Sequence, residues 1–430
     1  MPRVIVIGAG VAGLAAARSL HRKGLEVLVL EARHRIGGRI FTTRHERDHV
    51  PVELGAEFVH GRPPAIFELA KSTDWRLVEC ADQRWLRKES GLEPLNDFWK
   101  IIERVDGQID SQSSHTYQEF LNHAEASVFE KVIARSYVEG FNAARADRIC
   151  ASAVAFADQA AVDIDGDQQF RIAQGYDALV ELLAHELPAT TIRTACIVQR
   201  IEWKNRPAKI EFLTDAGQEH DAADHVIITV PIGVLRAADH QPGAIAFDPP
   251  LSDKRAALEK IEPGHVVKIV MSFREPFWRS RLPDDSQPLG FAMNLEAPFQ
   301  TWWDHEPLCA NRLTGWAGGP AAEMMSGQAS TEILGSAISS LGATFDLPPD
   351  RIAQELVSWH WHDWSTDPFS RCAYSYPAPG GIEAARILAA PLANTLFFAG
   401  EATDFHGYNG TVHGALASGW RAAEEVLSTI

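Results

Sequence analysis

The chain has 430 residues, 46% hydrophobic and 23% charged, which is typical of a globular protein with room for two domains. Its 57 Asp and Glu against 40 Lys and Arg give a net charge of −17. That charge disfavours nucleic acid and anionic membranes as partners and weakly favours a cationic small molecule. The five scattered cysteines contain no CxxC pair, so we expect no disulfide framework and no metal site. No leader peptide and no membrane-spanning run is expected, and the sequence predicts a soluble, cytoplasmic protein.

The first predicted elements form a βαβ unit. Its strand, helix and second strand are expected at residues 4–7, 12–22 and 26–30. Gly8 allows the tight turn, Gly10 lets the backbone approach a pyrophosphate, and Gly13 lets the helix pack on the sheet. The helix N-terminus stabilises phosphate charge, and Glu31, after the second strand, can bind ribose hydroxyls. The unit predicts binding of a nicotinamide or flavin dinucleotide.

Two glycines follow just past the second strand. Gly37 and Gly38 let the backbone pass close to a ligand, and Arg39 beside them can meet a phosphate. Residues 52–61 then predict a short strand and a tight turn.

Helical spacing dominates residues 63–150, which predicts a helical insertion outside the nucleotide domain. Its helices are expected at residues 66–72, 97–109, 117–123 and 126–140. Strands are expected at residues 191–203, 209–214, 225–230, 266–273 and 396–400, with a turn at 215–217, and the last helix starts at Thr411. The sequence therefore predicts an α/β protein with a Rossmann-like nucleotide domain and a second α+β domain of mixed sheet and helices. The first domain is assigned to residues 1–75, 172–247 and 381–430, and the second to residues 76–171 and 248–380.

Four blocks carry a resemblance to a known family. They are residues 4–39, residues 264–278 around Lys268, residues 364–380 with Tyr374, and residues 398–419. In order and approximate spacing these blocks resemble the flavin-containing amine oxidases, which include monoamine oxidases, polyamine oxidases and histone lysine demethylases. The resemblance implies FAD as cofactor, with hydride taken from the carbon next to an amine nitrogen and oxygen giving hydrogen peroxide.

The resemblance also implies the residues that line the cofactor site. Reduced flavin carries negative charge at its pyrimidine end, which the positive end of the last helix at Thr411 and Val412 would stabilise. Trp364 would lie alongside the flavin, and Glu401 would contact the ribityl and phosphate region after Gly400. Further contacts are expected from Ala32, Arg33, Gly55, Ala56, Glu57, Phe58 and Val198.

Lys268 and Tyr374 are the expected reaction-site residues. Lys268 interrupts an apolar strand, and spacing alone would place its amine at the surface. In the family, this lysine instead reaches flavin N5 through a water, and we expect burial to favour its neutral amine. Tyr374 would form one wall of an aromatic cage. The opposite wall, a second Tyr in monoamine oxidases, is here Thr411, as in the histone demethylases.

His60 is the third candidate for contact with substrate. Polyamine oxidases often place an acid or a His at this point to meet a distal amine, and Glu57 is the alternative. Because Ala373 stands where the mitochondrial monoamine oxidases carry the cysteine that bonds the flavin, we expect FAD to be bound non-covalently. Cys372, one residue away, would point to the other face of a strand.

The sequence thus predicts an FAD-dependent amine oxidase that uses an amine and O2, with no nucleic-acid or membrane partner. The half-open cage, His60 and the acidic balance favour a polyamine or other secondary amine. A primary monoamine or an L-amino acid is the alternative substrate. Two other functions stay open: a flavin desaturase or dehydrogenase acting on C–C bonds, and a non-catalytic FAD-binding protein.

Overall fold

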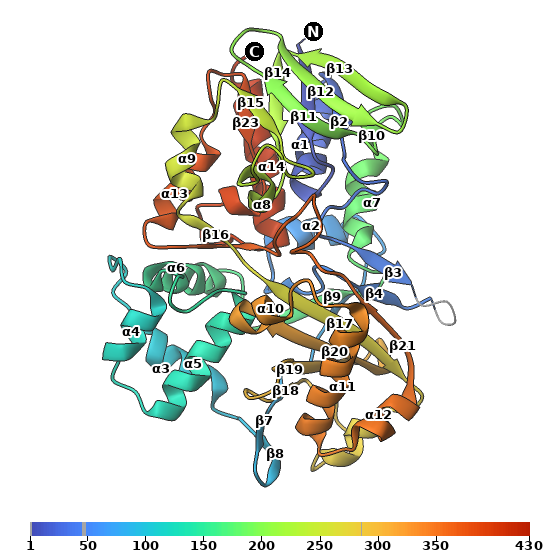
Figure 1. Cartoon of the computed structure of the whole chain (residues 1–430), viewed down its shortest axis with the longest axis vertical. Helices are drawn as coiled ribbons and strands as arrows, with labels where there is room; N and C mark the ends of the chain where they lie inside the picture. Colours follow the sequence, from blue (N-terminus) through green and yellow to red (C-terminus); the bar gives the residue numbers. More distant parts are fainter. Residues whose placement is uncertain (1, 45–48, 285) are drawn as a thin grey trace.

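The structure is a computed structural model that describes residues 2–44, 49–284 and 286–430. Within these residues the chain forms two halves, one around a parallel sheet and one around a mixed sheet (Figure 1). Both ends of the chain lie in the parallel half (Figure 1).

The parallel sheet takes its strands from the beginning, middle and end of the chain. Its described strands, in spatial order, are β10 (Ile192–Arg193), β2 (Glu26–Leu30), β1 (Arg3–Ile7), β14 (His225–Ile228) and β23 (Leu396–Phe398), all paired in parallel. Val4 to Val6 are fully buried, as expected of a parallel strand that is covered on both faces.

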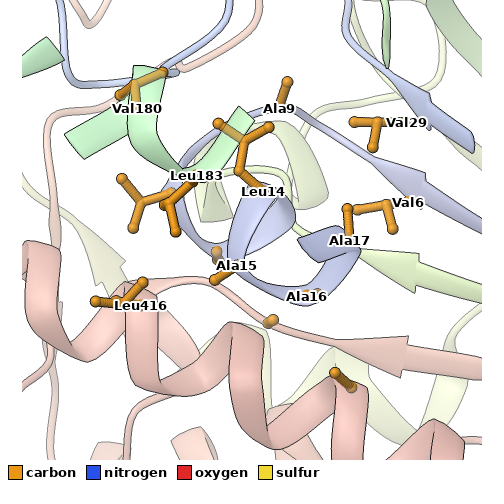
Figure 2. Packing of buried hydrophobic residues seen from close by; sticks show 14 of the residues in the cluster. Val6, Ala9, Leu14, Ala15, Ala16, Ala17, Val29, Val180, Leu183 and Leu416 are labelled. Atoms are coloured by element: carbon orange, nitrogen blue, oxygen red, sulfur yellow. The ribbon is translucent and has the colours of Figure 1, made fainter. Parts of the chain in front are cut away.

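Helix α1 (Val11–Arg22) packs between this sheet and α14 (Val412–Leu427). Its residues Leu14, Ala15 and Ala16 are fully buried, and Leu416 of α14 lies against them (Figure 2). Small alanines let the two helices approach closely. A Cβ on Gly419 would come within 2.2 Å of the carbonyl oxygen of Ala12. This packing holds the N-termini of α1 and α14 at the same end of the parallel strands.

The mixed sheet is the centre of the other half. Its described strands, in spatial order, are β21 (Leu356–Trp361), β17 (Val266–Phe273), β20 (Cys309–Gly318), β19 (Thr301–His305), β18 (Phe291–Met293), β7 (Arg84–Lys88) and β8 (Gly91–Pro94). All neighbours are antiparallel except β18 and β7, which are parallel. One face of this sheet packs on α11 (Ser330–Phe345), which buries Ile333, Ala337 and Leu341.

The remaining elements complete both halves. The strands are β3 (Thr42–Arg44) with β4 (Pro51–Glu53); β5 (Val59–His60), β9 (Gln169–Ile172) and β6 (Leu77–Glu79); β11 (Ile197–Glu202), β12 (Ala208–Thr214), β13 (Gly217–Ala223) and β15 (Ala246–Asp248); and β16 (Ile261–Pro263) with β22 (Ser375–Pro377). The helices are α2 (Pro64–Lys71), α3 (Phe98–Asp106), α4 (Tyr117–His123), α5 (Val128–Phe141), α6 (Ala151–Val162), α7 (Asp177–His185), α8 (Ile232–Leu235), α9 (Ser252–Leu258), α10 (Gly319–Met325), α12 (Pro349–Glu355) and α13 (Gly381–Ala389), with short 3-10 turns η1 (Phe277–Arg281) and η2 (Glu401–Thr403). None of the described helices has the length and apolar character needed to cross a membrane.

The predicted α/β fold class is confirmed, but one predicted strand was wrong and several elements were missed. The four helices predicted in residues 63–150 are present as α2, α3, α4 and α5, but the segment also contains β6, β7 and β8, which were missed. These strands pair with partners distant in sequence, such as β7 with β18, and local periodicity does not report such partners. The predicted strand 191–203 is two strands in different sheets, separated by a turn in which Ala195 has φ +53°. Strand β13 and helix α6 were not predicted.

The division into domains stays a prediction. Near one predicted boundary, two helices that were assigned to different domains pack together. Helix α9, assigned to the substrate domain, packs Leu258 against Ala384 and Leu388 of α13, which was assigned to the nucleotide domain.

Candidate active site

A long cavity begins at the glycine-rich turn between β1 and α1. Gly8 has φ +103°, a conformation that favours glycine, and a Cβ on Gly13 would come within 2.0 Å of the Gly8 carbonyl oxygen. The loop at Gly38 passes so close that a Cβ there would lie 3.2 Å from the Cα of Gly10. Gly8, Gly10 and Gly38 line the cavity, so backbone groups and the N-terminus of α1 are exposed to a ligand there. This arrangement suits a pyrophosphate.

Glu31 is held at the cavity wall by two backbone donors. The N–H of Ala9 donates to its Oε2 at 2.8 Å, and the N–H of Arg33 donates to its Oε1 at 2.9 Å. Glu31 is 4% exposed, and each of its oxygens keeps a second lone pair for a ribose hydroxyl. The residues therefore fit the ribose of a dinucleotide.

Arg39 and Glu401 form a clamp further along the cavity. Arg39 Nη1 lies 3.0 Å from Glu401 Oε1 and also donates to the carbonyl of Ala373. Glu401 Oε2 accepts from the Ser375 hydroxyl at 2.7 Å and from the Gly410 N–H at 2.9 Å. The carboxylate thus joins the segment around Ser375 to the loop before α14.

Thr411 is the N-cap of α14. Its Oγ1 accepts from the Gly414 N–H at 2.9 Å and donates to the Tyr408 carbonyl at 2.7 Å. Because this hydroxyl is engaged in capping, what Thr411 presents to the cavity is a helix N-terminus rather than a free hydroxyl. The first-turn N–H groups of α14, including that of Val412, have no partner within the helix and can stabilise an anion.

Lys268 lies at the centre of β17 and is 2% exposed. Its Nζ is 2.6 Å from Glu57 Oε2 and donates to the Gly55 carbonyl at 3.2 Å. The surface position expected from spacing alone is wrong, because Val52 and Leu54 pack on Val270, which shares a face of β17 with Lys268. The expectation of a neutral amine stays a prediction, and the structure places this amine against a carboxylate.

Glu57 is the centre of a buried charge cluster. Arg171 Nε lies 2.8 Å from its Oε1, and the indole N–H of Trp303 donates to the same oxygen at 3.0 Å. Burial by itself would raise the pKa of Glu57, but the nearby Lys268 and Arg171 cations outweigh it and hold that pKa far below its ordinary value. Glu57 is therefore ionised, and protein cations contact both of its oxygens.

Tyr374 and His60 line the same cavity as Lys268. The Tyr374 hydroxyl donates to the Phe141 carbonyl at 2.5 Å, which fixes the ring. The His60 ring packs edge-on against Phe141 with 5.2 Å between centroids, and its Nδ1 has no hydrogen-bond partner among the described residues. Burial lowers the pKa of His60 to about 4, so the imidazole is neutral at physiological pH.

Ala373 faces the cavity, whereas Cys372 is fully buried beneath it. The Cys372 side chain belongs to an apolar cluster with Ile232 and Ala384, away from the ligand space. Trp364, which is 3% exposed, donates its indole N–H to the Leu54 carbonyl at 2.9 Å and lines the cavity.

One cavity collects nearly all the predicted site residues. Those that line it are Gly8, Gly10, Glu31, Ala32, Arg33, Gly38, Arg39, Gly55, Ala56, Glu57, Phe58, His60, Val198, Lys268, Trp364, Tyr374, Gly400, Glu401, Thr411 and Val412. Gly13 does not line it and serves the packing of α1. Sequence reasoning missed the far arm of the cavity, which is lined by Arg84, Phe98, Trp99, Tyr137, Phe141, Phe291, Trp303 and Trp316. Their aromatic content was visible in the sequence, but nothing local brings strands β7, β18 and β19 together.

The fold and this cavity fit a dinucleotide cofactor, and the second half of the chain contributes a buried lysine to the ligand space. The model of the flavin containing amine oxidoreductases matches residues 11–427, and the chain belongs to that family. It is 29% identical to human lysine-specific histone demethylase 2 over 99% of this chain and 53% of that protein. It is 28% identical to human peroxisomal N(1)-acetyl-spermine/spermidine oxidase over 99% of this chain and 95% of that protein.

The chain spans about half the length of the two mammalian histone demethylases it matches. Among solved structures, wild-type putrescine oxidase bound to putrescine superposes with a TM-score of 0.80 and 21% identity, covering 99% of both chains. Cyclohexylamine oxidase from Brevibacterium oxydans gives a TM-score of 0.80 and 20% identity, covering 100% of this chain and 99% of that one. These structures share the fold.

Proposed function

We propose that this protein binds FAD non-covalently and oxidises an amine, with dioxygen as the electron acceptor. The observation that carries the proposal is the buried Lys268 of β17, which shares one continuous cavity with Tyr374 and with the glycine-rich turn at Gly8. When bound, FAD supplies the acceptor for hydride from the carbon next to the amine nitrogen. A C–C desaturase or a non-catalytic FAD-binding protein has no evident need for a buried ion-paired lysine at this point.

The protein's own residues would hold and orient the cofactor and the substrate, and would enclose the reaction site. The Gly8 turn and the start of α1 would hold the pyrophosphate, Glu31 the adenosine ribose, and the N-terminus of α14 the pyrimidine end of the flavin. Tyr374 would hold the substrate amine, and Lys268 would position water beside the reacting atoms. Only the neutral amine donates hydride, and a cage with a single aromatic wall binds the cation weakly.

The charged residues of the cavity favour a different substrate from the one that the sequence favoured. The sequence favoured a polyamine, whose distal ammonium calls for a carboxylate. The carboxylates that line the cavity within the described residues are Glu31, Glu57 and Glu401, and each is engaged by protein donors. We therefore propose a primary or secondary amine with an apolar or aromatic body. A polyamine is the second candidate, supported by the similarity to the spermine/spermidine oxidase.

The test is peroxide release by the purified protein with a panel that includes benzylamine, N-methylbenzylamine, putrescine, spermidine and leucine. We expect peroxide with the aromatic amines and little with the polyamines. Peroxide from none of these amines contradicts the oxidase. Acid precipitation should release the yellow colour into the supernatant as FAD, and flavin retained in the pellet contradicts the non-covalent site and makes Cys372 the residue to examine.

A further inference from the structure

The floor of the cavity is one face of the mixed sheet. Val270 of β17 pairs with Thr314 of β20, and across the sheet the same row continues through Trp303 and Phe291 to Arg84. Cross-strand partners share a face, and residues two apart on a strand share it too. Lys268, two residues from Val270, therefore stands on the same face as Trp303, Phe291 and Arg84.

This row gives the cavity a direction and a length. Four strand spacings separate β17 from β7, which places the backbones of Val270 and Arg84 about 19 Å apart and that of Lys268 slightly further from Arg84. Between them the floor is aromatic, with Trp303 and Phe291 in tilted contact at 6.0 Å between centroids. Lys268, Trp303, Phe291 and Arg84 all line the cavity. The ligand space thus runs from the reaction site over apolar rings to a guanidinium.

Arg84 is held in place by its neighbours, but not all of its N–H donors have a hydrogen-bond partner among the described residues. Its side chain is 10% exposed, and its guanidinium lies over the rings of Phe98 and Phe291 at 4.2 and 4.8 Å from the centroids. One edge is engaged, because Nη2 donates to Asp82 Oδ1 at 2.8 Å. The buried Nε has no hydrogen-bond partner among the described residues. A buried donor without a partner is costly and calls for an acceptor.

The charges near this end of the cavity indicate what kind of ligand group would accept from Arg84. Asp82 accepts from Arg84 and from the Trp99 indole at 2.6 Å, and it does not line the cavity. No carboxylate of the described chain faces the cavity beside Arg84. Asp82 balances the charge of Arg84 from outside the cavity, so a second ammonium on the substrate would meet only N–H donors here. A carboxylate would instead form charge-assisted hydrogen bonds with the donors that are left.

We propose that Arg84 forms an anion subsite, and that the substrate is an amine whose far end carries a carboxylate, joined to the amine by an apolar chain or ring. This rests on the proposed amine oxidase only for the amine end, because the subsite itself is a binding property. The planar fork of Arg84 suits a carboxylate, and the aromatic rings between the two ends suit the spacer.

Binding without turnover tests the subsite directly. Calorimetry on the FAD-loaded protein would compare phenylhexanoate with its neutral analogue phenylhexanamide. We expect Arg84→Met to weaken binding of the carboxylate about ten- to hundredfold and of the amide less than about twofold. Arg84→Lys should restore part of the carboxylate affinity. Asp82→Asn should act with the opposite sign and tighten binding of the carboxylate, since it removes the negative charge that balances Arg84.

Arg62 provides the matched control. It is an exposed arginine over the Phe170 ring, at 4.8 Å, and lies outside the cavity, so Arg62→Met should change neither affinity. Equal carboxylate affinities of wild type and Arg84→Met overturn the proposal and leave Arg84 as a structural partner of Asp82.

Turnover gives the second measurement. A series of ω-amino carboxylates and α,ω-diamines of matched chain length should show higher kcat/KM for the carboxylates, and Arg84→Met should remove the difference. A wild type that prefers the diamine at every length overturns the proposal. If no amine yields peroxide while carboxylate binding still depends on Arg84, the oxidase proposal fails and the anion subsite stands.

Discussion

The Nζ of Lys268 lies 2.6 Å from Oε2 of Glu57, and the two side chains are 2% and 3% exposed. Arg171 contacts the other oxygen of the same carboxylate. Two cations thus share one anion at the wall of the cavity, beside the proposed flavin site. Such a cluster can stabilise negative charge that develops nearby without any movement of the protein.

Replacing Glu57 should destabilise the fold. Glu57→Gln leaves Lys268 and Arg171 buried without their counter-charge, and we expect the free energy of unfolding to fall by about 3–5 kcal/mol. Urea denaturation measures this. The control is Glu219→Gln, which removes the exposed ion pair with Arg193 and should lower the free energy of unfolding far less than Glu57→Gln. Similar losses in the two variants would show that the Glu57 cluster contributes no more than a surface pair.

Replacing Lys268 should slow the reaction and spare the cofactor. In Lys268→Met, Glu57 keeps Arg171 as a partner, so the protein should fold and bind FAD. We expect turnover to fall about tenfold or more, through flavin reduction, reoxidation or both. Anaerobic stopped-flow with the amine, and separate mixing of the reduced protein with oxygen, assign the effect.

Lys254→Met is the matched control for a buried lysine. Lys254 is 2% exposed, donates to the Ile387 carbonyl at 2.6 Å and does not line the cavity. Its loss should lower stability and leave both rates unchanged. Normal rates in both half-reactions for Lys268→Met would return Lys268 to a structural role.

The pH dependence of kcat/KM should follow the substrate. Glu57 is held by protein cations, and His60, whose pKa burial lowers to about 4, is too weak a base to take the proton of the amine. We therefore expect no described group near Tyr374 to deprotonate the amine. The rate should rise with pH as the amine loses its proton, and the midpoint should move with the pKa of each amine tested. Benzylamine and a fluorinated analogue of lower pKa make the comparison. A midpoint that stays constant between them would instead indicate a titrating group of the protein.

His413 should make the fold sensitive to acid. It is 7% exposed, and burial, with a smaller contribution from His60, lowers its pKa to about 3. The unfolded chain binds a proton near pH 6.5, whereas the folded chain does not, so the stabilisation is complete above pH 6.5 and is lost as pH falls towards 3. Urea unfolding of His413→Phe should lose about 2 kcal/mol less than wild type between pH 6.5 and 5. The assignment is contradicted if the free energies of unfolding of the two proteins change equally between pH 6.5 and 5. It is also contradicted if the pH dependence of these free energies differs above pH 7.

Local pattern was enough for the nucleotide half. The prediction of a strand, the Gly8 turn, a helix and Glu31 required only neighbours in sequence, and the structure has β1, α1 and β2 at those places. The strand at residues 266–273 was also predicted with its observed limits. These features depend on apolar periodicity and on glycine conformation, which are properties of short segments.

The far arm of the cavity could not be predicted in this way. Arg84 reads as a charged residue in a helical segment, and only its pairing with Phe291, over 200 residues away, places it on the cavity floor. Glu57 and Lys268 are likewise 211 positions apart, and Arg171 comes from a third segment.

By itself the sequence determined the dinucleotide unit, the fold class and the family, since these depend on local pattern and motif order. Only the tertiary structure decided what Lys268, Glu57 and Arg84 do. A charged side chain can be solvated, ion-paired or free to bind a ligand. Which of these holds depends on the distant strands that bury the side chain and on the opposite charges that they bring close to it.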